Sequence, residues 1–198
     1  QVFGNARVSG DAQVFGNARV YGDARVYGNA WVSGDARVSG DAQVLGNAQV
    51  FGNAQVFGNA RVSGDAQVFG NARVYGDARV YGNAWVSGDA RVSGDAQVLG
   101  NAQVFGNAQV FGNARVSGDA QVFGNADILH ITGLGTIYRT TTAFRTPDGV
   151  RIVCGCFYGD VEAFREQVKK TRGGKVQREY LKFAEMVEIH FSEDEEDE

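Results

Sequence analysis

The sequence predicts a mainly β protein in which a long, narrow solenoid is followed by a small α+β domain. Three observations support this prediction. A six-residue unit recurs without interruption from Gln1 to Ala126, the apolar residues inside each unit alternate as they do in a strand, and the remaining residues lose the repeat. A short fixed period is typical of solenoids, in which each coil contacts only its neighbours.

Each unit reads polar, Val, variable, Gly, Asn or Asp, Ala, from Gln1–Ala6 through to Gln121–Ala126. The alternation places Ala and Val on one side of a strand, and the polar and variable residues on the other. The Gly-Asn or Gly-Asp pair then interrupts the strand, because these residues tolerate left-handed backbone conformations. A helix is disfavoured, since a glycine in every unit costs about 1 kcal/mol each relative to alanine. Each unit is therefore expected to form one short strand and one corner.

The Val2-x-x-x-Ala6 spacing, repeated through residues 1–126, resembles the hexapeptide-repeat, left-handed parallel β-helix proteins. The resemblance implies a triangular coil of three units, 18 residues in all. It also implies a left-handed path, which the repeat period alone does not reveal because crossovers between parallel strands are usually right-handed. The chain departs from many members of that family in carrying bulky residues such as Phe3 and Leu45 directly after the valine.

An internal duplication agrees with an 18-residue coil. Residues 1–54 recur without change as 55–108, and 109–126 repeat the first eighteen residues, so the duplicated block equals three whole coils. Seven coils would form a rod roughly 34 Å long at the usual strand spacing. Such complete identity is typical of an engineered array or of a very recent duplication.

The outward residues differ among the three faces of the predicted triangle. One face has no arginine in either outward column and is the most apolar, which makes it a candidate interface. Its aromatic residues are Phe15, Trp31, Phe51, Phe69, Trp85, Phe105 and Phe123. The alternative is that these rings only stabilise neighbouring coils as cross-strand pairs.

Charge and composition exclude several functions. Residues 1–126 contain nine arginines and nine aspartates and form no basic stripe, so we expect no nucleic-acid partner. The same residues lack the threonine rows expected of ice-binding solenoids. No apolar run is long enough to span a membrane, and no secretory signal is recognisable. Two cysteines without a disulfide framework favour a reducing, cytoplasmic environment.

After the repeat, we expect an α+β domain over residues 127–191 and a disordered acidic tail over 192–198. Residues 136–145 and 150–158 read as two strands joined by a turn at Pro147-Asp148-Gly149. Asp160 is expected to cap a helix over 161–171, and a second helix is expected over about 175–189. The apolar face of the second helix contains Val176, Tyr180, Phe183, Ala184 and Val187.

We expect this domain to cap the last coil, whose backbone edge would otherwise template aggregation. Residues 131–135 and 154–157 resemble the terminal domain of some uncharacterised bacterial and phage hexapeptide-repeat proteins, which implies no activity. The first coil has no comparable cover in this sequence. It is expected to be exposed or to pair with another molecule.

Candidate catalytic residues are sparse. The resemblance implies two possible chemistries. Hexapeptide-repeat acyltransferases use a histidine as general base, and carbonic anhydrases of this fold use three histidines as zinc ligands. Residues 1–126 contain no His, Cys or Glu, so neither mechanism can be carried over. His130, Cys154, Cys156 and His190 could form a zinc set if Cys154 and Cys156 lay on one face of a strand, but their spacing is not a recognised pattern. Buried structural cysteines are the plainer interpretation.

The segment Arg139–Arg145 contains three threonines between two arginines and could hold an anion, although an exposed hairpin face is the alternative. We expect no cofactor and find no evident small-molecule substrate. The leading hypothesis is a non-enzymatic structural scaffold with flat repetitive faces. The alternatives are a binding module or adhesin that uses the aromatic residues, and a metal protein or enzyme centred on the terminal domain.

Overall fold

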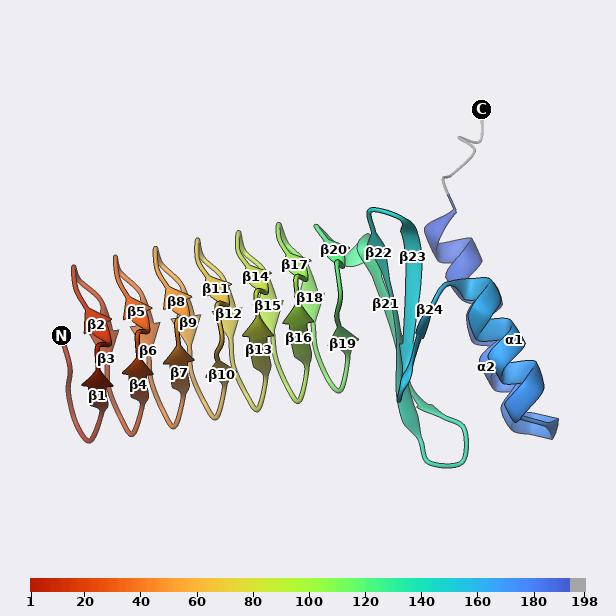
Figure 1. The fold of residues 1–198 in the computed structure, drawn as a ribbon, viewed down its shortest axis with the longest axis horizontal. Coiled ribbons are helices and arrows are strands. Elements are labelled where there is room, and N and C mark those ends of the chain that lie inside the picture. The colour runs from red at the N-terminus through yellow and green to blue at the C-terminus, as the bar shows by residue number, and fades with distance from the viewer. Residues whose placement is uncertain (193–198) are drawn as a thin grey trace.

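The computed structural model describes residues 1–192. Of the predicted acidic tail, only Ser192 belongs to this range, and the rest of that prediction lies outside the described residues. Residues 1–124 form a stack of coils, and the following elements form a sheet with two helices at one end of the stack (Figure 1).

The stack contains three parallel sheets, each made of strands from successive coils. The first sheet consists of β1 (Arg7–Gly10), β4 (Arg25–Gly28), β7 (Gln43–Gly46), β10 (Arg61–Val62), β13 (Arg79–Gly82), β16 (Gln97–Gly100) and β19 (Arg115–Val116). The second consists of β2 (Gln13–Val14), β5 (Trp31–Val32), β8 (Gln49–Val50), β11 (Gln67–Val68), β14 (Trp85–Val86), β17 (Gln103–Val104) and β20 (Gln121–Val122). The third consists of β3 (Arg19–Val20), β6 (Arg37–Val38), β9 (Gln55–Val56), β12 (Arg73–Val74), β15 (Arg91–Val92) and β18 (Gln109–Val110).

The register confirms the predicted coil of 18 residues. Val8 pairs with Val26 and Arg19 pairs with Arg37, each one coil further along the chain. A parallel bridge between Val2 and Val20 extends the third sheet into the first coil. Each of the three sheets therefore has seven rungs, joined by six 18-residue steps.

The interior of the stack consists of valine and alanine, as the alternation predicts. Every Val and Ala of the repeat from Ala18 to Val122 is fully buried. The first coil is more open, and Val2 is 46% exposed. A core this narrow is stable because stacking buries a continuous column that a single coil could not bury.

The corners are held by backbone and side-chain bonds along the stack. The amide of Asn29 donates to the carbonyl of Gly46 at 2.8 Å, and its side chain donates to Asn47 at 3.1 Å. The amide ladder continues from Asn47 to Asp65 at 2.9 Å. These ladders follow from the repetition of Asn or Asp at the corner position of every unit.

The terminal region begins with a short 3-10 helix, η1 (Asn125–Asp127). Its strands are β21 (Ile128–Leu134), β22 (Arg139–Thr146), β23 (Gly149–Cys154) and β24 (Phe157–Gly159), arranged in that order in one antiparallel sheet. Its helices are α1 (Val161–Thr171) and α2 (Gly174–Phe191). The helices cover the face of this sheet that points away from the stack (Figure 1).

Two strand predictions were wrong in this region. The strand expected over 136–145 begins only at Arg139, and the one expected over 150–158 is interrupted at Gly155. Gly155 has a positive φ of 63° and forms a turn, so the chain reverses there and adds β24 as a fourth strand. Helix α1 has the predicted bounds, and Asp160 accepts a hydrogen bond from the Ala163 amide at 2.7 Å.

Strand β22 is buried on both sides, which contradicts the exposed hairpin face considered from the sequence. Phe144 packs with the valines and alanines of the stack, whereas Ala143 packs with the helices. Thr141 and Thr142 are buried as well. Their hydroxyl groups are satisfied: Thr142 Oγ1 accepts from the Arg115 amide at 3.1 Å, and Thr141 Oγ1 donates to Cys154 Sγ at 3.3 Å.

Candidate functional site

Two surfaces carry most of the residues that the sequence marked as candidates. The first is the outward side of the second sheet, which we call the aromatic face. It consists of Phe15, Trp31, Phe51, Phe69, Trp85, Phe105 and Phe123, which lie in or directly after strands of that one sheet. The second is a pocket in the terminal domain.

Rings in consecutive coils touch along the aromatic face. Phe51 and Phe69 stack in parallel with centroids 4.9 Å apart. Phe69 also makes an edge contact with Trp85 at 6.2 Å, and the same contact occurs between Phe15 and Trp31 at 6.0 Å. These contacts agree with the view that the rings stabilise neighbouring coils.

Stacking does not bury the whole face. Trp31 is 45% exposed, Trp85 is 40% exposed and Phe123 is 51% exposed. The tryptophans occupy a column that is otherwise glutamine, and Trp31 pairs in register with Gln13 and Gln49. The face can therefore offer both flat apolar area and amide groups to a partner.

The cysteines and histidines proposed as a zinc set are not brought together. Cys154 ends β23 and Cys156 lies in the following turn, so the two are not on one face of one strand as expected. His130 packs its ring against Phe111, and His190 packs against Phe191. Within residues 1–192, no group of three or more His, Cys, Asp or Glu side chains could hold a metal ion.

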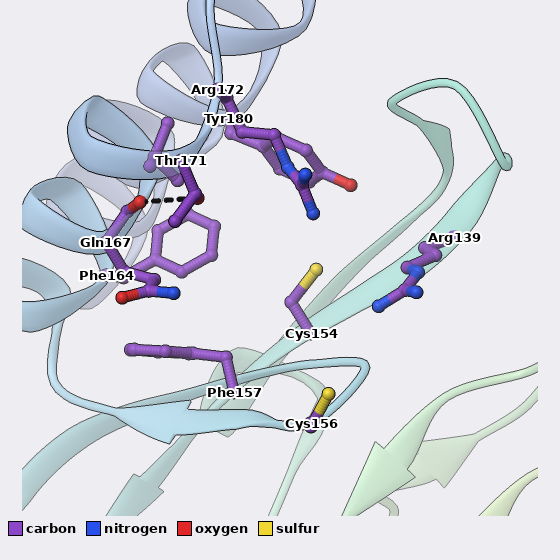
Figure 2. Close-up of a pocket in the computed structure, with 10 residues that line it drawn as sticks. Arg139, Cys154, Cys156, Phe157, Phe164, Gln167, Thr171, Arg172 and Tyr180 are labelled. Carbon is purple, nitrogen blue, oxygen red and sulfur yellow. Dashed lines mark hydrogen bonds between the residues drawn. The ribbon is translucent and has the colours of Figure 1, made fainter.

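Both cysteines line a pocket between the terminal sheet and the helices (Figure 2). Its cavity of about 110 Å³ is formed by Arg139, Cys154, Cys156, Phe157, Phe164, Gln167, Val168, Thr171, Arg172 and Tyr180. The sheet contributes Arg139 and the cysteines, whereas α1 contributes the apolar Phe164 and Val168. Arg172 comes from the C-cap of α1, and Tyr180 comes from α2.

The pocket is lined by hydroxyl, thiol and guanidinium groups. Burial is the main cause that raises the pKa of Tyr180 to about 12, and the electrostatic effect of Cys154 is the second. The guanidinium groups of Arg172 and Arg139 act in the opposite direction and lower this pKa. The Tyr180 hydroxyl donates to the carbonyl of Leu134 at 3.4 Å. Tyr180 is therefore a neutral hydrogen-bonding group throughout the physiological pH range.

The Arg139 side chain lies directly against the turn that joins β23 and β24. A Cβ atom at Gly155 would overlap its guanidinium group, so the close approach depends on glycine at that position. The other arginine of the predicted anion cluster is elsewhere. Arg145 pairs with Asp127 at 3.1 Å and lies over the Phe191 ring, so the two arginines do not form one anion site.

Sequence reasoning missed the pocket because its walls come from five separate elements. Tyr180 and Phe164 were placed only on helix faces, and Arg172 was not singled out. The glycine between Cys154 and Cys156 was the one signal for the turn that sets these walls.

No helix among the described residues is long and apolar enough to cross a membrane.

The fold and these surfaces define a repeat protein built as a parallel β-solenoid with a terminal α+β domain. A family model described as YdcK Beta solenoid repeat matches twelve segments that cover more than half of the chain. The matched residues are 1–16, 12–28, 18–34, 24–40, 30–46, 48–64, 54–68, 66–82, 72–88, 78–94, 84–100 and 108–124. The chain therefore belongs to the YdcK β-solenoid repeat family. A comparison with curated proteins gave no match.

Proposed function

We propose that the protein is a non-enzymatic scaffold, a stiff rod that holds the terminal domain at a fixed distance from the first coil. The observation that carries this proposal is the unbroken register, in which every Val and Ala from Ala18 to Val122 is buried. No loop interrupts the repeat to form a concave site on the rod. Residues 1–126 also lack the His, Cys and Glu side chains that most acid–base chemistry uses. The left-handed path implied by the hexapeptide-repeat resemblance is part of this proposal.

The terminal domain would cap the rod by satisfying its last backbone edge. In earlier coils, amides donate to carbonyls of the next coil, as Arg91 does to Ala108 at 2.9 Å. In the last coil, Gln109 N donates to Asn125 Oδ1 and Phe123 N donates to Asp127 Oδ2, each at 2.9 Å. The Arg115 amide likewise donates to Thr142 Oγ1. In all three bonds, a side-chain oxygen of the terminal domain takes the place of a carbonyl of a further coil.

Deletion of residues 55–108 tests the scaffold role. Because three whole coils are removed and the register is kept, the variant should fold and its length should fall by about 14 Å. Small-angle X-ray scattering measures that length. A variant that unfolds, or whose length does not change, would contradict the proposal.

Thr142→Val tests the capping role without truncating the chain. The substitution keeps the shape but leaves the Arg115 amide without its acceptor, so stability should fall by about 1–3 kcal/mol and association should increase. Thr132→Val is the matched control, because Thr132 bonds only with Thr140 in the exposed part of the sheet. Equal effects of the two substitutions would refute a capping role.

A second candidate function is binding, including self-association, through the aromatic face. The exposure of Trp31 and Trp85 favours it. Replacing both with glutamine, the residue that already fills the rest of their column, should abolish association through this face, as measured by light scattering. The control replaces Phe57 and Tyr75, which stack on another face. If both pairs of substitutions leave the mass in solution unchanged, the aromatic face only stabilises the stack. Association through the first coil would persist in either variant.

A further inference from the structure

The pocket of the terminal domain holds two guanidinium groups that have no acidic partner among residues 1–192. The ion pairs in that part of the chain involve Arg145, Arg165, Lys175 and Lys182, and none involves Arg139 or Arg172. Glu179, beside the pocket residue Tyr180, is already engaged by Lys175 at 3.5 Å and by the Gly135 amide. Arg139 is partly buried and Arg172 is exposed, so both guanidinium groups are accessible to an anion that enters the cavity.

Figure 2 shows the Arg139 and Arg172 side chains reaching toward Cys154 from two directions. Arg139 is anchored on β22 and held against the turn at Gly155, and Arg172 is anchored at the end of α1. Guanidinium groups present planar pairs of donors that match a carboxylate. The two groups therefore bracket a position at which an anionic head group can be bound.

The opposite wall of the pocket is apolar. Phe157 and Phe164 pack edge to face with centroids 5.3 Å apart, and Val168 lies one turn further along α1. The amide of Gln167 supplies one more polar group. The cavity of about 110 Å³ is below the 300–1,000 Å³ of sites for drug-sized ligands, so only a small molecule fits.

We propose that this pocket binds a small organic carboxylate, with the carboxylate held by Arg139 and Arg172 and the apolar part packed against Phe157 and Phe164. This function is separate from the scaffold role of the rod. The rod would then serve to hold a ligand-binding domain away from whatever the other end contacts.

Benzoate is a suitable probe, and benzamide is its neutral counterpart of the same shape. We expect benzoate to shift the backbone amide resonances of residues around the pocket, with a Kd on the order of 1 mM. Benzamide should bind at least about 10-fold more weakly, because it cannot form charge-assisted hydrogen bonds. Inorganic phosphate should also bind more weakly than benzoate, because it gains nothing from the apolar wall.

Arg139→Gln and Arg172→Gln should each weaken benzoate binding about 10-fold or more. Arg139→Lys and Arg172→Lys keep the charge and should retain part of the affinity, which separates a binding effect from misfolding. Arg178→Gln is the control, since Arg178 is exposed on α2 and does not line the pocket. Arg115→Gln is a second control. Arg115 and Arg139 both line a neighbouring groove, so this substitution would weaken binding only if benzoate occupied that groove and not the pocket.

Alkylation of the cysteines gives an independent measurement, because Cys154 and Cys156 line the same cavity. Bound benzoate should slow the modification of Cys154 by iodoacetamide, as followed by mass spectrometry. The proposal would be overturned if benzoate produced no response, if benzamide or phosphate bound as well as benzoate, or if the control substitutions weakened binding as much as those at Arg139 and Arg172.

Discussion

The corners of the rod allow a sharp test of how closely the coils pack. Gly94 and Gly112 occupy the same corner in consecutive coils, with φ values of 66° and 63°. A Cβ atom on Gly94 would lie 3.0 Å from both the nitrogen and the oxygen of Gly112. A Cβ atom on Gly112 would meet nothing within 4 Å. The two glycines thus share a backbone conformation but differ in axial packing.

Alanine at either position would incur the strain of a left-handed backbone, about 1–2 kcal/mol. The reduced entropy of the unfolded chain offsets about 0.4–1 kcal/mol of this strain. Gly112→Ala should therefore destabilise the protein by about 1 kcal/mol. Gly94→Ala must in addition push two coils apart, because backbone atoms cannot yield as a flexible side chain can. Overpacking of this kind adds about 1–3 kcal/mol, for a total of about 2–4 kcal/mol.

Urea unfolding followed by far-UV circular dichroism measures both variants, with the midpoint compared at constant slope. The difference between them isolates the cost of axial contact, since the backbone strain cancels. If Gly94→Ala and Gly112→Ala agreed within about 0.5 kcal/mol, the coils would have room for a methyl group at this corner. The close spacing of the coils would then not be what requires glycine.

Three further predictions concern charge. Asp23→Asn should stabilise the rod by about 0.5–1 kcal/mol in thermal unfolding, because it removes repulsion from Asp41 in the next coil and adds an amide hydrogen bond. Asp65→Asn is the control and should stabilise the rod less, because Asp65 has asparagines in both neighbouring coils. Burial lowers the pKa of His130, so its stabilising contribution is present above the usual pKa of 6.5 and lost as pH falls below it. His130→Gln should remove that loss in unfolding measured against pH. The pKa of Tyr180 is raised from 10.0 to about 12, so stability should fall between these pH values, and Tyr180→Phe should flatten the fall.

The rod could be predicted almost completely from its sequence. The pattern within each unit predicts which residues face inward and where the corner lies. The 18-residue period predicts which residue lies one coil away, so the pairing of Val2 with Val20 follows from counting. The polar ladders follow in the same way, as the bond from Asn83 to Asn101 at 3.0 Å shows. Local signals dominate here because every contact repeats the one before it.

The terminal domain was less predictable because its contacts are not local. Strand β22 carries buried threonines, and nothing in their sequence shows that Arg115 and Cys154 would satisfy their hydroxyl groups. The pocket depends on how far α1 extends before Arg172 and on where β23 reverses at Gly155. Both are properties of packing between distant segments, and the periodicity that made the rod readable is absent.

The division between a uniform rod and a chemically varied end has a physical cause. In the repeat, the valine, alanine and glycine positions are fixed by the core and the corners, and only the two outward strand residues and the Asn or Asp of each corner vary. Outward residues on flat sheets form broad faces, and the grooves among them are lined by polar corner and strand side chains such as Asn53, Arg73 and Asp89, so contact with a larger partner suits them best. In the terminal domain, a sheet and helices of unequal length meet, and the gap at Arg139, Cys154 and Tyr180 is the result. Ligand chemistry in this protein should therefore be sought at the end of the rod, and contacts with larger partners along its sides.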